Sequence, residues 1–252
     1  MSGTLNHSLL KALNILNLFT REQKELRLKE ICALLNLPAS TTHRTLRTLE
    51  ELDFITQNPL NGKYRLGASA FIIGTNVEDI NQLVDTSLPY IAKLSTKYNA
   101  TTHVAIEQNG HVLCIEKIES PLNTVNTPPR GARHELHLTS LGKCMLAFSP
   151  PKKQLALIQN IDFSAVTPSS ITCRDILIAE LRQVKSQGYA IDRKESSECL
   201  YCFGAPVFGK RNEVVGAISV SLNSNTLPRQ AANIISDVKS SAHEISILMD
   251  LA

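Results

Sequence analysis

Apolar residues in the first fifty positions recur at helical spacing and predict three short helices. These helices cover residues 6–20, 28–36 and 40–52. Pro38 lies between the second and the third, where a proline ends a helix because it cannot continue the hydrogen-bond ladder. Ser40 is well suited to cap the start of the third helix. We therefore expect a compact three-helix unit with a tight turn between its last two helices.

Residues 53–67 predict a hairpin directly after these helices, because Asn61-Gly62 is a strong signal for a two-residue turn. Three helices followed by a hairpin predict a winged helix-turn-helix. The leucines of the third helix face inward, which leaves side chains outside that can bond bases or phosphates, and the hairpin adds a basic wing. The predicted DNA-binding residues are Ser40, Thr41, His43, Arg44, Arg47, Thr48, Lys63, Tyr64 and Arg65. Such units also serve in dimerisation or protein docking, but the combined features favour DNA.

Beyond the hairpin, a helix over residues 68–84 is expected to link this unit to a mixed α/β region. There the period changes repeatedly between 3.6 and 2, which is typical of an α+β domain with an antiparallel sheet. The predicted helices are 87–99, 140–148, 152–161, 174–188 and 226–251, and the predicted strands are 102–108, 111–119, 189–195, 199–208 and 214–223. The expected organisation is a DNA-binding domain (1–67), a linker helix (68–84) and a ligand-sensing domain (85–252).

Composition changes this picture in two respects. The net charge of +3 resides entirely in residues 1–67, which hold nine Lys/Arg and six Asp/Glu, an asymmetry expected of a nucleic-acid-binding module. Neither a run of eighteen apolar residues nor a signal-peptide pattern is found, and the six cysteines are spread singly. We therefore expect a soluble cytoplasmic protein with reduced thiols.

Several motifs together resemble the IclR-type bacterial transcriptional regulators over nearly the whole chain. They are "LPASTTHRTLRTLEELDFI", "GKYRLG", "GARHELHLTSLGKCMLAF", "GYAIDRKE", "CFGAPVF" and "VVGAISVS". The resemblance implies a winged helix-turn-helix, a linker helix and a GAF-like effector domain that binds a small organic acid. It further implies a non-enzymatic regulator, a repressor of a catabolic operon, that acts as a homodimer or dimer of dimers on palindromic double-stranded operator DNA.

The resemblance also implies an effector site, carried over to Ser140, Leu141, Asp192, Leu200, Cys202, Ser219 and Ser221. Strand periodicity agrees, because Ser219 and Ser221 are two apart and therefore share one face. The helix that opens at "SLGK" can offer backbone N–H groups to a carboxylate. The chain departs from the family pattern at Arg193, Lys194 and Cys199. Basic residues near the "GAR" loop favour a sugar acid as effector, and they are Arg130, Arg133 and His134.

Other chemistries are weaker hypotheses. "TSLGKC" lacks the glycine and the Ser/Thr of a phosphate-binding loop. The two histidines of "HELH" have no carboxylate or cysteine partners with which to bind a metal ion. His103, Cys202 and Asp192 can be drawn as a thiol triad, but no nucleophile motif supports it. Cys199 and Cys202 leave open a thiol- or metal-responsive regulator, although residues three apart on a strand point to opposite faces. No cofactor, no catalytic residue and no metal ligand is predicted.

Overall fold

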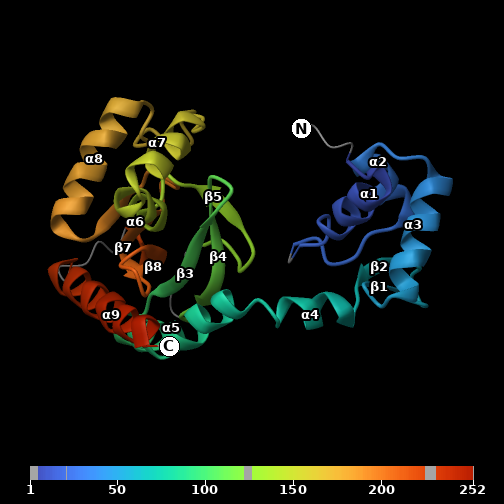
Figure 1. Ribbon diagram of the computed structural model, residues 1–252, viewed down its shortest axis with the longest axis horizontal. Coiled ribbons are helices and arrows are strands. Elements are labelled where there is room, and N and C mark those ends of the chain that lie inside the picture. The colour runs from blue at the N-terminus through green and yellow to red at the C-terminus, as the bar shows by residue number, and fades with distance from the viewer. Residues whose placement is uncertain (1–4, 21, 122–126, 225–230, 252) are drawn as a thin grey trace. The chain divides into compact units, whose positions relative to one another are not determined.

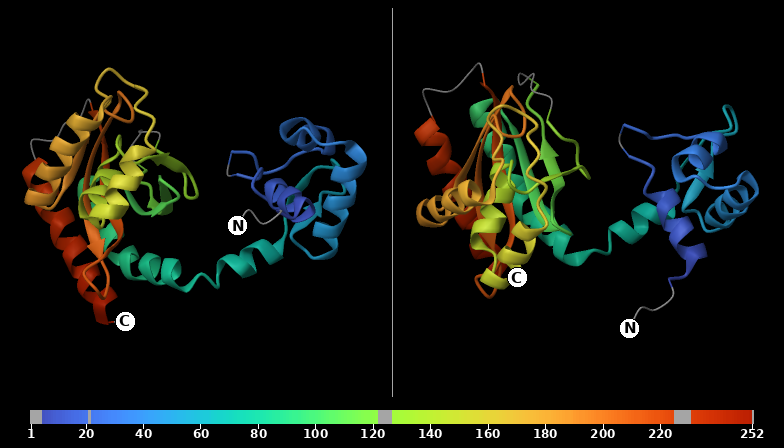
Figure 2. Two further views of the ribbon diagram at one scale, coloured as in Figure 1. Left: turned by 45° about the horizontal axis from the view of Figure 1, so that its top comes forward. Right: turned by 90° about the horizontal axis from the view of Figure 1, so that it is seen from above.

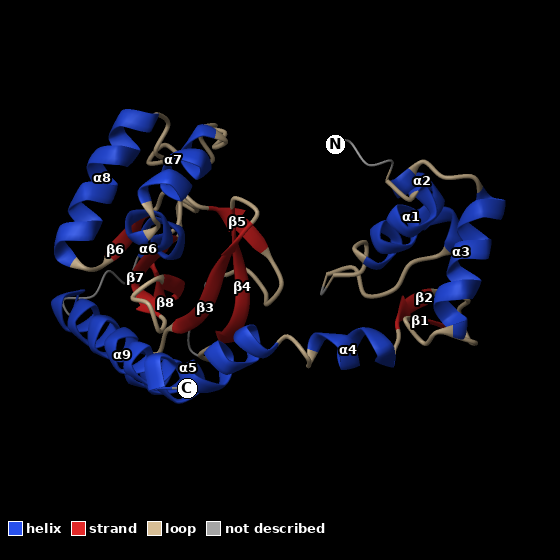
Figure 3. Cartoon of the chain, in the orientation of Figure 1, coloured by secondary structure: helices blue, strands red, loops and turns tan. Residues whose placement is uncertain are grey.

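The computed structural model describes residues 5–20, 22–121, 127–224 and 231–251. The chain divides into two compact units, Met1–Asn81 and Gln82–Ala252. Figure 1 traces the order of the elements along the chain, and Figure 3 separates helices from strands. None of the described helices is both long and apolar enough to cross a membrane.

The first unit is a three-helix cluster followed by a two-stranded hairpin, as predicted. Its elements are α1 (His7–Leu16), α2 (Leu28–Leu35), α3 (Ala39–Glu51), β1 (Ile55–Gln57), β2 (Tyr64–Leu66) and α4 (Ala68–Gly74). One side chain from each helix, Ile15, Ile31 and Leu46, is fully buried in a shared core. The apolar stripe of α3 therefore faces inward and leaves its polar face exposed.

Two details of this unit differ from the sequence prediction. Ser40 does not cap α3, because Pro38 already occupies the N-cap position and its carbonyl accepts the first helical bond from Thr42 N–H at 3.0 Å. The linker is two helices rather than one, since α4 ends at Gly74 and α5 begins at Glu78 (Figure 2). The side chains of Thr75 and Asn76 both donate to the Ile72 carbonyl, and such local bonds compete with the helical ladder.

The second unit is an α+β domain built on one antiparallel sheet in the order β5-β4-β3-β8-β7-β6. Its elements are α5 (Glu78–Tyr98), β3 (Thr101–Gln108), β4 (His111–Ile118), β5 (Arg133–Glu135), α6 (Ser140–Phe148), α7 (Pro151–Gln159), α8 (Arg174–Gln187), β6 (Ala190–Arg193), β7 (Leu200–Phe208), β8 (Val214–Asn223) and α9 (Ala231–Leu251). The sequence did not predict β5, a three-residue edge strand of polar side chains. The expected final helix began at residue 226, and residues 226–230 lie outside the described part.

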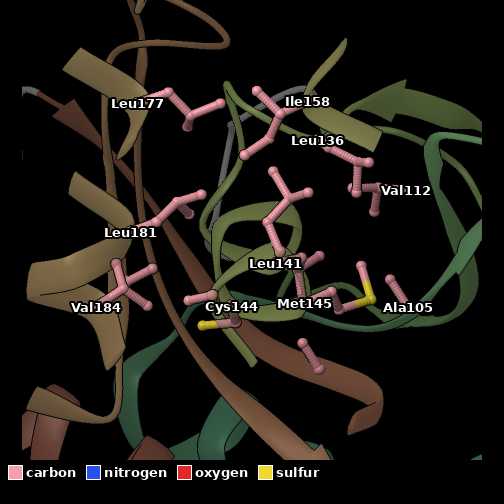
Figure 4. Packing of buried hydrophobic residues seen from close by; sticks show 14 of the residues in the cluster. Ala105, Val112, Leu136, Leu141, Cys144, Met145, Ile158, Leu177, Leu181 and Val184 are labelled. Carbon is pink, nitrogen blue, oxygen red and sulfur yellow. The ribbon is translucent and has the colours of Figure 1, made fainter. Parts of the chain in front are cut away.

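Helix α6 is the centre of the second unit. Figure 1 shows α6, α7 and α8 on one side of the sheet, and α5 and α9 on the other. Nearly every residue of α6 is buried, and Cys144 and Met145 lie between α8 and strands β3 and β4 (Figure 4). A helix that is buried on nearly all sides is part of a core rather than a surface element.

Two glycines allow α6 to approach its neighbours this closely. A Cβ on Gly142 of α6 would overlap the Leu136 carbonyl oxygen and lie 2.6 Å from the Leu136 Cα. A Cβ on Gly204 of β7 would lie 3.0 Å from both the Cβ and the Oγ of Ser140, at the start of α6. The first turn of α6 is therefore pressed onto the sheet at Gly204 and against the chain at Leu136.

Replacing Gly142 with alanine is expected to lower the free energy of unfolding of the second unit by about 3 kcal/mol, because the new methyl group meets backbone atoms that cannot rotate away. Gly74→Ala is the control, since Gly74 lies in helix α4 with nothing within 4 Å of the added Cβ, and alanine is the better helix former. Urea unfolding followed by circular dichroism measures both. Equal stability of Gly142→Ala and the wild type would show that α6 is not held as closely as described.

Candidate functional site

The outward face of α3 carries most of the residues predicted to contact DNA. His43, Arg44, Arg47 and Thr48 are exposed, whereas Leu46 and Leu49 are buried. Ser40 is also exposed and Thr41 is half-buried. No acidic side chain lies in the first turn of α3, so the positive end of the helix dipole is unopposed there. This face combines two free guanidinium groups with a helix N-terminus, which suits phosphates and guanine edges.

The hairpin forms a wing whose tip is fixed by a carboxylate. Glu25 accepts hydrogen bonds from the side-chain amides of Asn58 (3.3 Å) and Asn61 (3.0 Å). These bonds lower the pKa of Glu25, with smaller contributions from the charges of Arg65 and Lys63. Arg65 is exposed and Lys63 is half-buried, so both can reach a phosphate backbone.

Tyr64 is a correction to the predicted set. Its side chain is buried in the core of the first unit, and its backbone pairs with Leu26 in both directions. Strand alternation explains the difference, because Tyr64 and its neighbour Arg65 must point to opposite faces and only one can be outside. Tyr64 supports the wing from beneath and is not available to DNA.

Strand register brings most of the predicted effector residues together on one face of the sheet in the second unit. Asp192 of β6 lies opposite Cys202 of β7, and Cys202 lies opposite Ser221 of β8. In the next row, Gly204, Ser219 and His103 are neighbours across β7, β8 and β3. Directly opposed residues share a face, so these rows form a polar patch within an apolar domain.

Hydrogen bonds connect this patch through His103. The hydroxyls of Ser219 and Ser221 each lie 3.5 Å from His103 Nδ1, and Ser221 Oγ donates to Cys202 Sγ at 3.1 Å. All four residues are buried. The prediction that both serines face the same side, next to Cys202, is therefore confirmed.

Two buried polar atoms at this patch have no hydrogen-bond partner among the described residues. They are Nε2 of His103 and Oγ of Ser140, which lies over Gly204. A buried polar group without a partner costs free energy, so such atoms mark places where a ligand or a water binds. Leu141 and Leu200 are buried as well and offer apolar surface.

Asp192 stabilises the loop after β6. Its Oδ1 accepts from the backbone N–H of Glu195 at 2.7 Å, and its Oδ2 accepts from the Ser196 hydroxyl. Glu195 in turn binds the buried ammonium of Lys143 at 2.7 Å, and that ammonium also donates to the Ile191 carbonyl at 2.5 Å. Burial raises the pKa of Asp192, whereas the bond from Ser196 opposes this shift. The carboxylate and Lys143 thus tie the first turn of α6 to the β6–β7 loop.

Burial determines the chemistry of the remaining groups. Burial lowers the pKa of His103 to about 3, assisted by the charges of Lys117 and His134, so its imidazole is neutral at physiological pH. Burial also raises the pKa of the Cys202 thiol, which makes it a poor nucleophile. Cys199 is exposed and precedes β7.

The basic residues expected to favour a sugar acid do not converge on the patch. Arg130 pairs with Glu116 at 3.0 Å, and Arg133 donates to the Gln108 side chain at 3.2 Å. His134 shares a sheet with the patch but lies on β5, which strands β4 and β3 separate from β8. Among the described residues, no group of three or more His, Cys, Asp or Glu side chains is placed to hold a metal ion. A cavity of about 380 Å³ between α8 and α9 involves none of the predicted effector residues.

Lys117 is the residue at this patch that sequence reasoning missed. It lies directly opposite His103 across β3 and β4. Counting alternation outward from the Asn109-Gly110 turn pairs His103 with Glu116, but a bulge between Val104 and Ala105 shifts the register by one residue. The isolated sequence offers no signal for this bulge.

The chain is similar to known proteins over most of its length. The model of the IclR helix-turn-helix domain matches residues 8–59, and the model of the bacterial transcriptional regulator IclR C-terminal region matches residues 76–247. The HTH-type transcriptional regulator XynR of Escherichia coli K12 is 33% identical over 211 residues, 84% of each protein. The HTH-type transcriptional repressor AllR of Salmonella typhimurium is 26% identical over 211 residues, 84% of this chain and 78% of that protein.

A solved structure extends the likeness to the fold. An IclR homologue from Microbacterium hydrocarbonoxydans, in complex with 4-hydroxybenzoate, matches with a TM-score of 0.89 at 18% identity and covers 97% of this chain and 100% of that one. At this identity the match supports the fold alone.

Replacing His103 with glutamine should change how stability depends on pH. Unfolded His103 binds a proton below its ordinary pKa of 6.5, whereas the folded group resists protonation down to about 3, so wild-type stability falls as the pH drops through this window. The difference in unfolding free energy between wild type and His103→Gln should therefore move by about 2 kcal/mol in favour of the variant between pH 7.5 and pH 5. Urea titrations at several pH values measure it, and a difference that stays constant would contradict a buried neutral imidazole.

Proposed function

The chain belongs to the IclR family of bacterial transcriptional regulators, and from this premise we propose that it represses a catabolic operon and is relieved by a small organic acid, such as a sugar acid. It is thus a DNA-binding regulator with a small-molecule-sensing domain, in a family that is not enzymatic. The observation that carries the effector assignment is the buried polar patch of Ser219, Ser221, Cys202 and His103, with unpartnered atoms on His103 and Ser140.

Residues 1–67 are proposed to bind operator DNA through the outer face of α3 and the wing. Arg44 and Arg47 lie one turn apart on α3 and are both exposed, so they can enter a major groove together. Residues 68–84 connect this unit to the effector domain, residues 85–252. We propose that the protein works in the cytoplasm, where its operator lies.

The proposed functional assembly is a homodimer that reads two half-sites, alone or as a dimer of dimers. Helices α1 and α4 of the first unit present apolar side chains to solvent, including Leu9 (58% exposed), Leu13 (49%) and Phe71 (74%). Large apolar side chains that are exposed on a small unit are typical of an interaction surface. A second copy fits it because a two-fold axis presents the same surface on both partners.

The acid is proposed to bind over the patch, between the sheet and the first turn of α6. Ser140, Ser219 and Ser221 supply hydroxyls, and neutral His103 supplies a ring nitrogen. Leu141 and Leu200 add apolar contact, and Asp192 supports the surrounding loop. AllR is named as a repressor, which supports the proposed direction of regulation.

Loss of either α3 arginine should weaken operator binding without unfolding the protein. Arg44→Ala and Arg47→Ala are each expected to raise the operator Kd about 10- to 100-fold, the range for a lost base or phosphate contact of about 1–3 kcal/mol. Arg182→Ala, an exposed arginine of α8, is the control with the same loss of charge. Fluorescence anisotropy gives the affinities, and footprinting should show two symmetric half-sites. Wild-type affinity in both α3 variants would overturn the helix assignment.

Loss of the patch hydroxyls should reduce acid binding while DNA affinity stays the same. A thermal-shift screen with D-gluconate, D-glucuronate, glyoxylate and 4-hydroxybenzoate should find an acid that raises the melting temperature of the wild type. Ser219→Ala and Ser221→Ala should lose at least half of that shift, because each removes a buried hydrogen-bonding group. Ser240→Ala, at an exposed position of α9, is the matched control. An undiminished shift in both patch variants would place the ligand elsewhere.

A further inference from the structure

We propose that Lys117 is the cation that binds the effector's carboxylate, and that Glu119 is an internal competitor which the carboxylate displaces. This inference rests on the proposed function, since it assigns a specificity-determining residue to the same site. Lys117 lies outside the effector set implied by the resemblance, and the observations that assign it are its register, its burial and the unpartnered atoms around it.

The register places Lys117 on the polar patch. Lys117 opposes His103, and His103 opposes Ser219 on its other side, so one row crosses β4, β3 and β8. Side chains directly opposed on neighbouring strands lie about 5 Å apart at Cβ. The bulge at Val104/Ala105 decides the sign of the charge in this row, because without it the carboxylate of Glu116 would face His103. The fold therefore brings a cation to a patch that would otherwise hold an anion.

The ammonium of Lys117 is buried, whereas its ion-pair partner is in solvent. The Lys117 side chain is 7% exposed, and its Nζ donates to the Thr127 carbonyl at 2.8 Å and pairs with Glu119 Oε1 at 2.5 Å. The Glu119 side chain is 70% exposed. An exposed carboxylate is well hydrated and gains little from its ion pair, so a ligand carboxylate that also accepts hydrogen bonds from buried groups can displace it.

Two buried polar atoms on residues next to Lys117 indicate a ligand. Nε2 of His103 and Oγ1 of Thr127 have no hydrogen-bond partner among the described residues; His103 lies opposite Lys117 in the sheet, and the Thr127 carbonyl accepts from the Lys117 ammonium. A carboxylate that replaces Glu119 on Lys117 has a second oxygen that can accept from the Thr127 hydroxyl or from the His103 ring. One bound anion would then satisfy atoms that the protein leaves unsatisfied.

The other ionisable groups near Lys117 do not oppose this role. Burial lowers the pKa of both His103 and His134, so neither imidazole carries a positive charge at physiological pH that would compete with Lys117 for the carboxylate. Glu116 is engaged with Arg130. Glu119 is thus the carboxylate paired with Lys117 among the described ion pairs.

Acetate is the probe, because it is a small carboxylate with no other polar group, and acetamide is its neutral isostere. Heteronuclear NMR titrations of the full chain at low ionic strength are expected to give saturable shifts of the Lys117 and His103 signals with acetate and none with acetamide. Lys117→Met should raise the acetate Kd at least about tenfold. Glu119→Gln should lower it about two- to fivefold, because the competitor has lost its charge. Lys153→Met is the control, since Lys153 of α7 pairs at 2.5 Å with Glu107 of the same sheet but is half exposed.

Opposite responses of Lys117→Met and Glu119→Gln, with Lys153→Met unchanged, would support the inference. Absence of saturable acetate shifts, or wild-type acetate affinity in Lys117→Met with its fold intact by circular dichroism, would overturn it. The two proposals fail separately. A sugar-acid melting shift that depends on Ser221 but not on Lys117 would leave the effector site standing and remove Lys117 from it. Acetate bound at Lys117 with no acid-induced melting shift would do the reverse.

Discussion

The close approach of α6 to the sheet is the constraint on which the second unit depends. It is possible only where Gly142 and Gly204 carry no Cβ. It places the apolar residues of α6 at the centre of the core. It also brings the ammonium of Lys143 to the carboxylate of Glu195 in the β6–β7 loop. The same approach sets Ser140 over the polar patch, so one packing contact both stabilises the domain and builds its site.

A polar patch within this core opposes stability, and the domain tolerates it because most of its atoms find partners. Ser219, Ser221 and Cys202 bond within the patch, whereas His103 Nε2, Ser140 Oγ and Thr127 Oγ1 do not. An unsatisfied buried atom costs roughly 1–3 kcal/mol, which a ligand recovers when it supplies the missing hydrogen bond. Sites that bind are thus places where local rules for stability are broken in favour of function.

Periodic and local signals made most of the fold predictable. The three helices, the wing and five of the strands follow from spacing and from Asn-Gly turns, and strand periodicity correctly placed Ser219 and Ser221 on one face. The features of the fold and the site that could not be predicted from the sequence depend on contacts between distant segments. Strand β5 has no apolar period, Tyr64 is buried by helices that precede it, and Lys117 reaches the patch through a bulge. Ser40 does not cap α3 because the helix begins earlier, at Ala39, with Pro38 at the N-cap position.

Regulation by this protein requires that an acid bound in the second unit changes how the first unit binds DNA. The direct measurement is operator affinity of the full chain, by fluorescence anisotropy, with and without the acid that raises its melting temperature, on an operator selected from the region upstream of its own and neighbouring genes. We predict that saturating acid raises the operator Kd at least about tenfold, which is a coupling free energy of about 1.4 kcal/mol between acid binding and DNA binding. An operator Kd that does not change while the acid is bound would contradict it.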